Sequence, residues 1–358
     1  MDIIVDVKYS EQHEHHSEQH SEHHDHREQH EHREQHEHSD HREHHDHHSE
    51  QHSDKHYEEE IKQLTNKFNK LYKYIKKCTN NIPYITKPLL KWIGGKNQII
   101  NTIINKFPSE INNYHELFLG GGSVLLALLS YQKNNIINVK GEIYAYDINE
   151  PLINFFINVQ KYPLELFEKI QQIILEFNKQ DNKDYYYYIR NKYNKLKNKN
   201  NIEGSALFLF LNKTCFRGVF RISNNGFNVP YGNYNNPNII NKAHLLEVSK
   251  LIQNVIFKHY DYKESIKLIK DDDFVYLDPP YFNTYNNYTN NKFYEHKQLF
   301  DLCKKSKFNF LMSNSDILFV RESFNNYYIK TLYNCKRKIN SKNPNSVINE
   351  LLISNYVK

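Results

Sequence analysis

The chain has 358 residues, more than one ordinary domain, and a formal net charge of +5 at pH 7. Residues 1–60 hold 5 Lys or Arg against 19 Asp or Glu, so the other 298 residues carry a formal +19. This charge suits a polyanion such as nucleic acid, although a general drift of composition towards Lys is the alternative explanation. The four cysteines lack paired or metal-like spacing, which argues against a disulfide scaffold and a structural zinc site.

Residues 1–56 form a low-complexity tail of mainly His, Glu, Gln, Asp, Ser and Arg, with 18 of the 22 histidines. Most of it lacks the apolar periodicity that would offset the entropy of ordering, so a disordered, solvated segment is predicted. Weak transition-metal binding by the clustered imidazoles is the alternative role. The chain start does not resemble a secretory signal, and no run of about 18 apolar residues occurs. A soluble, intracellular protein with no membrane span is therefore expected.

Residues 57–82 are rich in Lys and predict an amphipathic linker helix. Its apolar positions follow helical spacing, at Ile61, Leu64, Phe68, Leu71 and Ile75.

The segments "YHELFLGGGSVLLALLSY" and "GEIYAYDINEPLINFFINV" are each typical of a strand, a turn and a helix, the second helix beginning near Pro151. Such units in succession indicate a doubly wound α/β sheet, whose ligands lie beyond the carboxyl ends of its strands.

The stretch 155–246 interrupts this alternation. It is rich in Lys, Asn and Tyr, and we interpret it as an inserted, mainly helical lobe that divides the α/β domain into 83–154 and 247–358. Further short strands are expected at 257–262, 274–277, 308–312 and 348–353.

The segment "FLGGGS" follows the first of these strands and opens a helix, so its glycines allow a ligand close to the backbone. It matches neither G-x-G-x-x-G nor a G-K-[ST] phosphate loop, which counts against a dehydrogenase and an NTPase. Asp147 ends the next strand, 27 residues after Gly120, where such folds place an acid on ribose hydroxyls. A helix-capping acid and a packing turn are the alternatives. Together the two features favour a nucleoside cofactor held without a phosphate grip, such as S-adenosylmethionine.

The run "FVYLDPPY" ends an apolar strand on an acid, two prolines and a tyrosine, Asp278 to Tyr281. If the substrate is an amino group on a base, the Asp278 carboxylate and the Pro279 carbonyl can each accept one of its hydrogens. That contact stabilises the charge that develops as the amine attacks a methyl group. Pro279 and Pro280 stiffen the segment, and Tyr281 can stack on a base turned out of the helix. A simple Pro-Pro turn is the alternative.

In this order, the motifs resemble the Dam-type, class alpha family of N6-adenine-specific DNA methyltransferases, from about residue 88 to 356. "LLKWIGGKNQII" resembles the family's K-W-x-G-G-K signature, and "ELFLGGGSVLL" its E-P-F-x-G-x-G-S loop, with Leu117 in place of proline, a change expected to loosen the turn. "YDIN", "DPPY" and "FLMSNSD" resemble the family's later motifs. The resemblance implies a Rossmann-like methyltransferase sheet with an inserted target-recognition lobe that carries a β-hairpin. It also implies cofactor contacts by Trp92, Lys96, Phe118, Gly120, Gly122, Ser123, Asp147 and Asp278. Asp261 ends another strand, in "KHYDY", and is a candidate contact for the cofactor's adenine, with a capping or surface acid as the alternative.

"LFLFLNKTCFRGVFRISNNGFNVPYGNY", residues 207–234, is similar to the family's target-recognition hairpin. The DNA-binding positions implied by this similarity are Lys91, Phe216, Arg217, Val219, Arg221, Pro230 and Asn233. Arg221 is suited to the O6 and N7 atoms of guanine. Arg217 and Asn233 differ from GATC-reading members, so GATC is one candidate among short sites. Phe208, Phe210 and Phe220 are expected to pack in the core.

The resemblance implies base flipping and direct, S-adenosylmethionine-dependent methylation of adenine N6 in double-stranded DNA by a monomer. A cognate restriction endonuclease is a candidate partner. N4-cytosine methylation and a non-catalytic DNA-binding or metal-binding protein on a methylase fold are the alternatives. No metal is expected in the active site. Replacing Asp278 by Ala is expected to abolish transfer and leave the fold intact.

Overall fold

The computed structural model describes residues 59–71, 83–281, 296–336 and 347–357. The chain divides into two units, Met1–Lys73 and Tyr74–Lys358. In the first unit the described residues form one helix, 59–71, inside the segment for which a linker helix is predicted. Its four apolar side chains are each more than half exposed. The tail at 1–56 and Ile75 lie outside the described residues.

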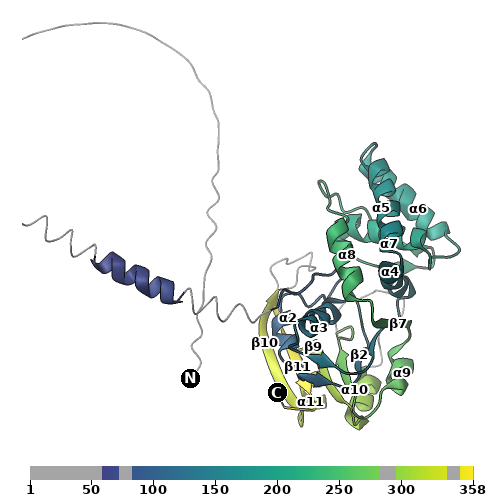
Figure 1. Ribbon diagram of the computed structural model, residues 1–358. Coiled ribbons are helices and arrows are strands. Elements are labelled where there is room, and N and C mark those ends of the chain that lie inside the picture. The colour runs from purple at the N-terminus through teal and green to yellow at the C-terminus, as the bar shows by residue number, and fades with distance from the viewer. Residues whose placement is uncertain (1–58, 72–82, 282–295, 337–346, 358) are drawn as a thin grey trace, which may run out of the picture. The chain divides into compact units, whose positions relative to one another are not determined.

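The second unit is built on a seven-stranded sheet with the order β10-β11-β9-β8-β2-β4-β7 (Figure 1). Neighbouring strands from β9 to β7 run parallel, whereas β11 is antiparallel to both β9 and β10. The strands are β2 (Tyr114–Glu116), β4 (Ile143–Asp147), β7 (Val255–His259), β8 (Phe274–Leu277), β9 (Asn309–Ser315), β10 (Tyr328–Lys336) and β11 (Val347–Ser354). Two small sheets pair β1 (Glu110–Ile111) with β3 (Asn138–Val139) and β5 (Ile222–Ser223) with β6 (Gly226–Phe227).

Helices cover both faces of this sheet, because successive side chains of a strand point to opposite faces. Phe274 and Tyr276 of β8 enter one hydrophobic cluster, and Val275 and Leu277 enter the other. The first cluster includes residues of α2 (Ile100–Ile104), α3 (Ser123–Lys133), α4 (Glu150–Lys161) and α8 (Lys242–Leu251). The second includes residues of α10 (His296–Lys305) and α11 (Leu318–Ser323). The mixed α/β class and the central, mostly parallel sheet are as predicted.

Local sequence explains where several elements begin and end. Helix α4 starts at Glu150 with Pro151 in its first turn, and the Asn149 side chain accepts a hydrogen bond from Leu152 N. Strand β8 matches the predicted 274–277. Strand β7 ends earlier than predicted, because Asp261 caps the short helix α9 (Tyr262–Ser265), which continues into η2 (Ile266–Leu268).

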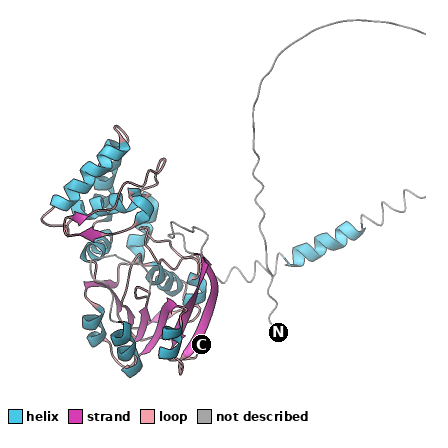
Figure 2. Cartoon of the chain, turned by 180° about the vertical axis from the view of Figure 1, so that it is seen from behind, coloured by secondary structure: helices cyan, strands magenta, loops and turns pink. Residues whose placement is uncertain are grey.

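The stretch between α4 and α8 contains α5 (Pro163–Phe177), α6 (Asn182–Lys195), α7 (Ile202–Thr214), the short η1 (Phe216–Gly218) and the β5–β6 hairpin. Helices α5, α6 and α7 pack together at one end of the unit, beyond α4 and α8 (Figures 1 and 2). Residues 207–214, predicted to begin the recognition hairpin, belong to α7. An apolar run such as "LFLFL" fits a buried helix as well as a strand, and here it is buried on all sides.

Phe208, Phe210 and Phe220 are buried in the core, as predicted.

In the part of the chain that the structure describes, no helix is both long and apolar enough to cross a membrane.

Candidate active site

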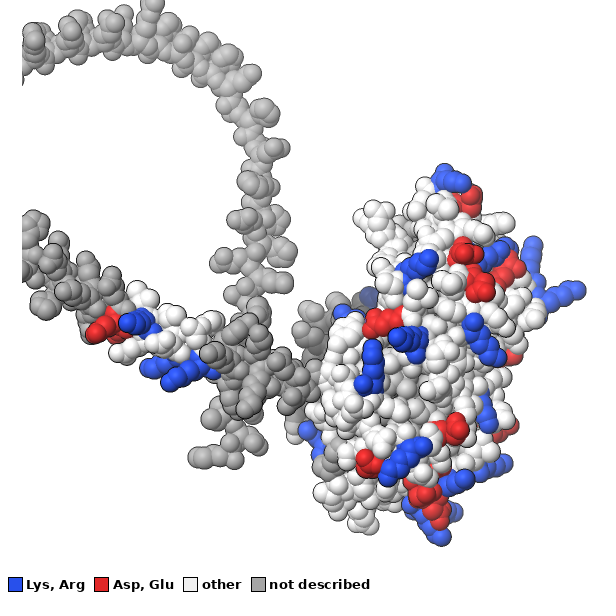
Figure 3. Space-filling model, in the orientation of Figure 1, with Lys and Arg blue, Asp and Glu red and all other residues white. Residues whose placement is uncertain are grey.

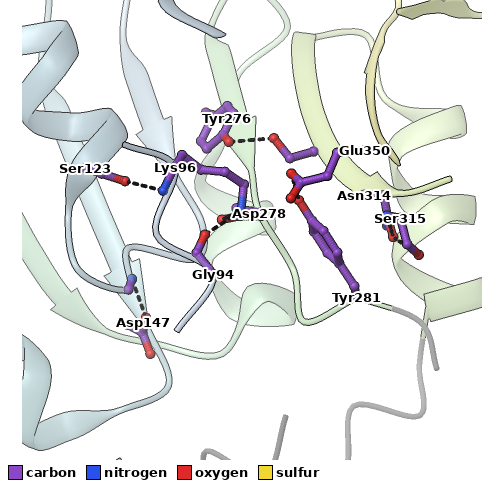
Figure 4. Close-up of polar contacts among 12 residues, drawn as sticks. Gly94, Lys96, Ser123, Asp147, Tyr276, Asp278, Tyr281, Asn314, Ser315 and Glu350 are labelled. Carbon is purple, nitrogen blue, oxygen red and sulfur yellow. Dashed lines mark hydrogen bonds and ion pairs between the residues drawn. The ribbon is translucent and has the colours of Figure 1, made fainter. Parts of the chain in front are cut away.

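Three conspicuous segments of the sequence meet at the carboxyl edge of the sheet. Strand β2 lies between β4 and β8 and runs parallel to both. The glycine loop after β2, Asp147 at the end of β4 and Asp278 after β8 therefore reach the same edge. Figure 4 shows Lys96 and Asp278 pointing towards one another there, with Asp147 on one side and Tyr281 on the other.

Asp147 braces the glycine loop. One carboxylate oxygen, Oδ2, accepts a hydrogen bond from Gly120 N at 2.9 Å, and Oδ1 accepts one from Asn149 N at 2.9 Å. Burial raises the pKa of this carboxyl, and the hydrogen bonds from backbone N–H groups act in the opposite direction. The predicted ribose-binding acid thus also fixes the loop that precedes α3.

The glycines of this loop are required by geometry. Gly120 and Gly122 have φ of +51° and +75°, which other residues rarely adopt. A Cβ at Gly120 or Gly121 would lie 2.9 Å from the side chain of Trp92, too close to fit without movement. Leu117 N, where the family usually has proline, donates to Tyr276 O at 3.2 Å and so ties the start of the loop to β8.

Lys96 and Asp278 form a largely buried ion pair. Lys96 Nζ lies 2.5 Å from Asp278 Oδ2, and the two side chains are 4% and 18% exposed. The ammonium also donates to Gly94 O at 2.7 Å, and the Lys96 backbone N–H donates to Ser123 Oγ at 3.2 Å. The sequence implied separate roles for these two residues, and the structure brings them into direct contact.

Tyr281 is anchored by an acid that sequence reasoning missed. Its hydroxyl donates to Glu350 Oε2 at 2.7 Å, and Lys96 Nζ lies 5.0 Å from the centre of its ring. Burial, followed by the neighbouring Asp278 and Glu350 carboxylates, raises the pKa of Tyr281 well above its ordinary value, so the phenol stays a donor. The side chain is 7% exposed. Glu350 is an acid within an apolar predicted strand, which was the signal available in the sequence.

The backbone carbonyl of Pro280 contacts the first residue of α10. His296 Nε2 donates to Pro280 O at 2.7 Å. Pro279 is buried and Pro280 half-buried. The chain directly after Tyr281, residues 282–295, lies outside the described part of the structure.

Glu116, at the end of β2, is a second acid of this region and is fully buried. Burial raises the pKa of Glu116 to about 8, and the neighbouring Asp278 and Asp147 carboxylates add to the rise. The Tyr114 hydroxyl donates to Glu116 Oε2 at 2.7 Å and opposes it. Glu116 is therefore mainly protonated at neutral pH, which limits the negative charge beneath the Lys96–Asp278 pair.

Two further cofactor candidates have structural partners. Phe118 stacks on Tyr262 with ring centres 6.0 Å apart. Asp261 accepts a hydrogen bond from Lys263 N at 2.8 Å and, with Glu264, forms a capping box at the start of α9. The capping alternative describes Asp261 in this structure, and its contact with a cofactor stays a prediction.

The predicted DNA-contact residues lie on the η1 turn, in the segments that flank the β5–β6 hairpin, and just before Trp92. Phe216 is 44% exposed, Pro230 is exposed, and Phe216 N donates to Pro230 O at 2.8 Å. The exposed Arg221 donates from Nε to Asn228 Oδ1 at 2.7 Å, and Val219 is half-buried.

Arg217 and Asn233, which depart from the GATC-type pattern, both have a left-handed backbone, with φ of +55° and +53°. Arg217 N donates to the Tyr234 hydroxyl at 2.8 Å, and Lys91 Nζ lies 4.0 Å from the centre of the Tyr234 ring. Lys91 therefore contacts the 207–234 segment through Tyr234, the same residue that binds the backbone of Arg217.

Among the described residues, no group of three or more His, Cys, Asp or Glu side chains forms a candidate metal site. A mostly parallel sheet in this strand order, with a glycine loop and an Asp-Pro-Pro-Tyr segment at its carboxyl edge, is the arrangement expected of a methyltransferase of the α/β class. The chain belongs to the D12 class N6 adenine-specific DNA methyltransferase family, which it matches over residues 92–340. It is a site-specific methyltransferase that acts on N6 of adenine in DNA, and N4 of cytosine was the alternative substrate atom.

Curated relatives match about three quarters of the chain. The type II methyltransferase M.MjaIII of Methanocaldococcus jannaschii is 35% identical over 294 residues, 75% of this chain and 99% of that protein. The DNA adenine methylase of Haemophilus influenzae is 31% identical over 277 residues, 72% of this chain and 89% of that protein. The type II methyltransferase M.CviBI of Paramecium bursaria Chlorella virus NC1A is 29% identical over 283 residues, 75% of this chain and 100% of that protein.

Proposed function

We propose that the protein uses S-adenosylmethionine as methyl donor and methylates an adenine turned out of a short duplex site, without a covalent enzyme intermediate. The observation that carries the proposal is the meeting of the glycine loop, Asp147 and the Lys96–Asp278 pair at one edge of the sheet. Cys215, Cys303 and Cys335, the cysteines that the structure describes, are all buried, and burial raises the pKa of Cys215 and Cys303 to about 12.

The residues at this edge fit a nucleoside cofactor with a charged amino-acid end. The glycine loop leaves no room for a Cβ beside Trp92, and Asp147 stands where ribose hydroxyls would be bound. Lys96 supplies a buried positive charge suited to a carboxylate. Phe118, Gly122 and Ser123 complete the proposed pocket, and Asp261 is proposed at its adenine end. When bound, S-adenosylmethionine would supply an electrophilic methyl group on sulfur.

The chain's own residues would then hold the amine and stabilise its charge. Asp278 and the Pro279 carbonyl would accept hydrogen bonds from the adenine amino group, whose nitrogen becomes positive as it is methylated. Lys96 donates to Asp278 Oδ2 and so fixes the orientation of that carboxylate. Tyr281 would stack on the base, with Glu350 holding its hydroxyl, after the ring has become more exposed than it is here.

We further propose that 155–246 is the target-recognition lobe and that 83–154 with 247–358 is the catalytic domain. The predicted DNA contacts belong to the η1 turn, to the segments that flank the β5–β6 hairpin, and to Lys91. GATC stays one candidate, because Arg217 and Asn233 depart from the GATC-type pattern. Basic and acidic side chains are interspersed on the face shown in Figure 3.

The proposed biological context is restriction–modification, because two of the relatives above are named type II methyltransferases. A cognate restriction endonuclease would then be a functional partner. Activity as a monomer and weak transition-metal binding by the His-rich tail are proposed from the sequence alone.

The proposal is tested by incubating the purified chain with methyl-labelled S-adenosylmethionine and unmethylated plasmid, followed by digestion to nucleosides. Label in N6-methyldeoxyadenosine, with none retained on denatured protein, is the expected result. Label retained on the protein would contradict direct transfer. Cofactor binding without any transfer would favour the non-catalytic alternative.

A further inference from the structure

Lys91 and Trp92 connect the proposed cofactor loop to the proposed recognition hairpin. The Trp92 side chain packs on Gly120 and Gly121 and also stacks on Phe220, with ring centres 6.1 Å apart and planes at 20°. Phe220 in turn contacts Phe227 of the hairpin, with ring centres 5.7 Å apart. A displacement of the hairpin core would therefore reach the glycine loop through two aromatic side chains, Phe220 and Trp92.

Asn212, in the last turn of α7, fixes the backbone at the start of this connection. Its Oδ1 accepts from Lys91 N at 2.9 Å, and its Nδ2 donates to Lys91 O at 2.8 Å. The same Nδ2 donates to Gly218 O at 3.3 Å. One amide thus satisfies both backbone groups of Lys91 and also binds the η1 turn. The side chain is 3% exposed, so loss of these bonds would leave buried polar groups unpaired.

Gly218 also lies directly against the side chain of Lys91. Gly218 has φ of +65°, and a Cβ there would lie 2.4 Å from Lys91 Cβ. Lys91 Nζ donates to Lys213 O at 3.1 Å and lies over the Tyr234 ring. The segment that carries Trp92 therefore cannot shift relative to α7 and η1 without breaking several short contacts at once.

We propose that Asn212 is a positioning residue that couples the cofactor pocket to the DNA-reading hairpin, so that occupation of either site strengthens binding at the other. The inference rests on the proposed function, since it takes the glycine loop as the cofactor site and the hairpin as the duplex site. Asn212 needs no contact with either ligand. Its effect is exerted through Lys91 and Trp92, and coupling of this kind is reciprocal between the two sites.

The chain offers a matched control in Asn194 of α6. Asn194 also holds one residue by both backbone groups, since its Nδ2 donates to Phe227 O at 2.9 Å and its Oδ1 accepts from Phe227 N at 2.8 Å. This second clamp joins α6 to β6 within the lobe, and the residue that it holds, Phe227, reaches Trp92 through Phe220. Asn212→Leu and Asn194→Leu thus remove the same kind of amide, and only the first removes hydrogen bonds to Lys91, the residue before Trp92.

The test measures the dissociation constant of S-adenosylhomocysteine, which cannot donate a methyl group. It is measured with and without a saturating, unmethylated duplex that contains the sequence motif that the protein methylates. The wild-type chain and Asn194→Leu should bind it about fivefold or more tightly with duplex present, whereas Asn212→Leu should show less than about a twofold change. Coupling in Asn212→Leu equal to wild type would overturn the role of Asn212. Independent binding of both ligands to the wild type would overturn the coupling and leave the proposed function standing. Failure of either ligand to bind the wild type would overturn both.

A second measurement keeps the inference falsifiable if Asn212→Leu does not fold. Trp92 is the only tryptophan of the chain, so intrinsic emission reports on it alone. Duplex added to the wild-type protein without cofactor should change that emission in parallel with the polarisation of a labelled duplex. Binding seen by polarisation with unchanged Trp92 emission would overturn the inference.

Discussion

Removal of the Asp278 charge should destabilise the fold as well as the transition state. Asp278→Asn keeps the shape of the side chain and leaves the Lys96 ammonium, 4% exposed, without the carboxylate 2.5 Å away. Breaking a buried ion pair by removing one partner costs about 3–5 kcal/mol. Asp278 is 18% exposed and Lys96 keeps its bond to Gly94 O, so a loss near the lower end, about 3 kcal/mol, is expected. The sequence alone suggested that the fold would be unaffected.

The same substitution should lower the methylation rate by about 100-fold or more, as expected when a preorganised hydrogen-bond acceptor is lost. Stability and rate separate in a double-mutant cycle with Lys96→Met. The double variant removes both charges, so it should regain much of the stability lost by Asp278→Asn. It should regain none of the activity.

Urea unfolding followed by circular dichroism, together with single-turnover methylation, measures the four proteins of this cycle. An Asp278→Asn protein within about 0.5 kcal/mol of wild type would refute the buried-pair reasoning. A double variant no more stable than Asp278→Asn would refute it as well.

Three further predictions concern the neighbouring residues. Glu350→Leu should lower the free energy of unfolding by about 1.5–3 kcal/mol and slow methylation, because the Tyr281 hydroxyl loses a charged acceptor. Glu350→Gln should lose less stability and less activity. Equal urea midpoints and equal rates for the two variants would contradict this prediction. The pKa of Glu116 is about 8 in the folded protein and near its ordinary 4.5 in the unfolded chain. Between these two values the unfolded chain binds fewer protons than the folded protein, so the contribution of Glu116 to stability falls as the pH rises from 4.5 to about 8. Glu116→Gln should remove this part of the pH dependence, and identical slopes of the unfolding free energy from pH 5 to 8 would contradict it. Arg221→Ala should relax discrimination at one base pair by about 1–3 kcal/mol in kcat/KM, measured on duplexes with single-base changes, and an equal fall on every duplex would favour a phosphate contact instead.

Local patterns in the sequence were sufficient where an element is defined by its own residues. The apolar run 274–277 is bounded by acids and prolines, and it forms β8 as predicted. Pro151 and Asn149 mark the start of α4 for reasons of backbone geometry. The edge at which the site lies followed from the alternation of strands and helices, because parallel neighbours end on the same side.

Other features depend on contacts that local patterns do not encode. The helix at 207–214 was taken for part of a hairpin, since a short buried apolar run has no clear period. Strand β10 was not predicted, and its polar sequence is explained by its place at the edge of the sheet. The Lys96–Asp278 pair spans 182 positions and the Tyr281–Glu350 bond 69, so each requires the strand order to be known first.

The most direct test of the central claim is modification-sensitive sequencing of DNA from a host without adenine methylation that expresses the wild-type chain. Because the chain is a site-specific adenine methyltransferase whose lobe is proposed to read the duplex, N6-methyladenine should occur in one short motif, and it should disappear when Asp278→Asn is expressed instead. N4-methylcytosine, or adenine methylation without a common motif, would contradict this account.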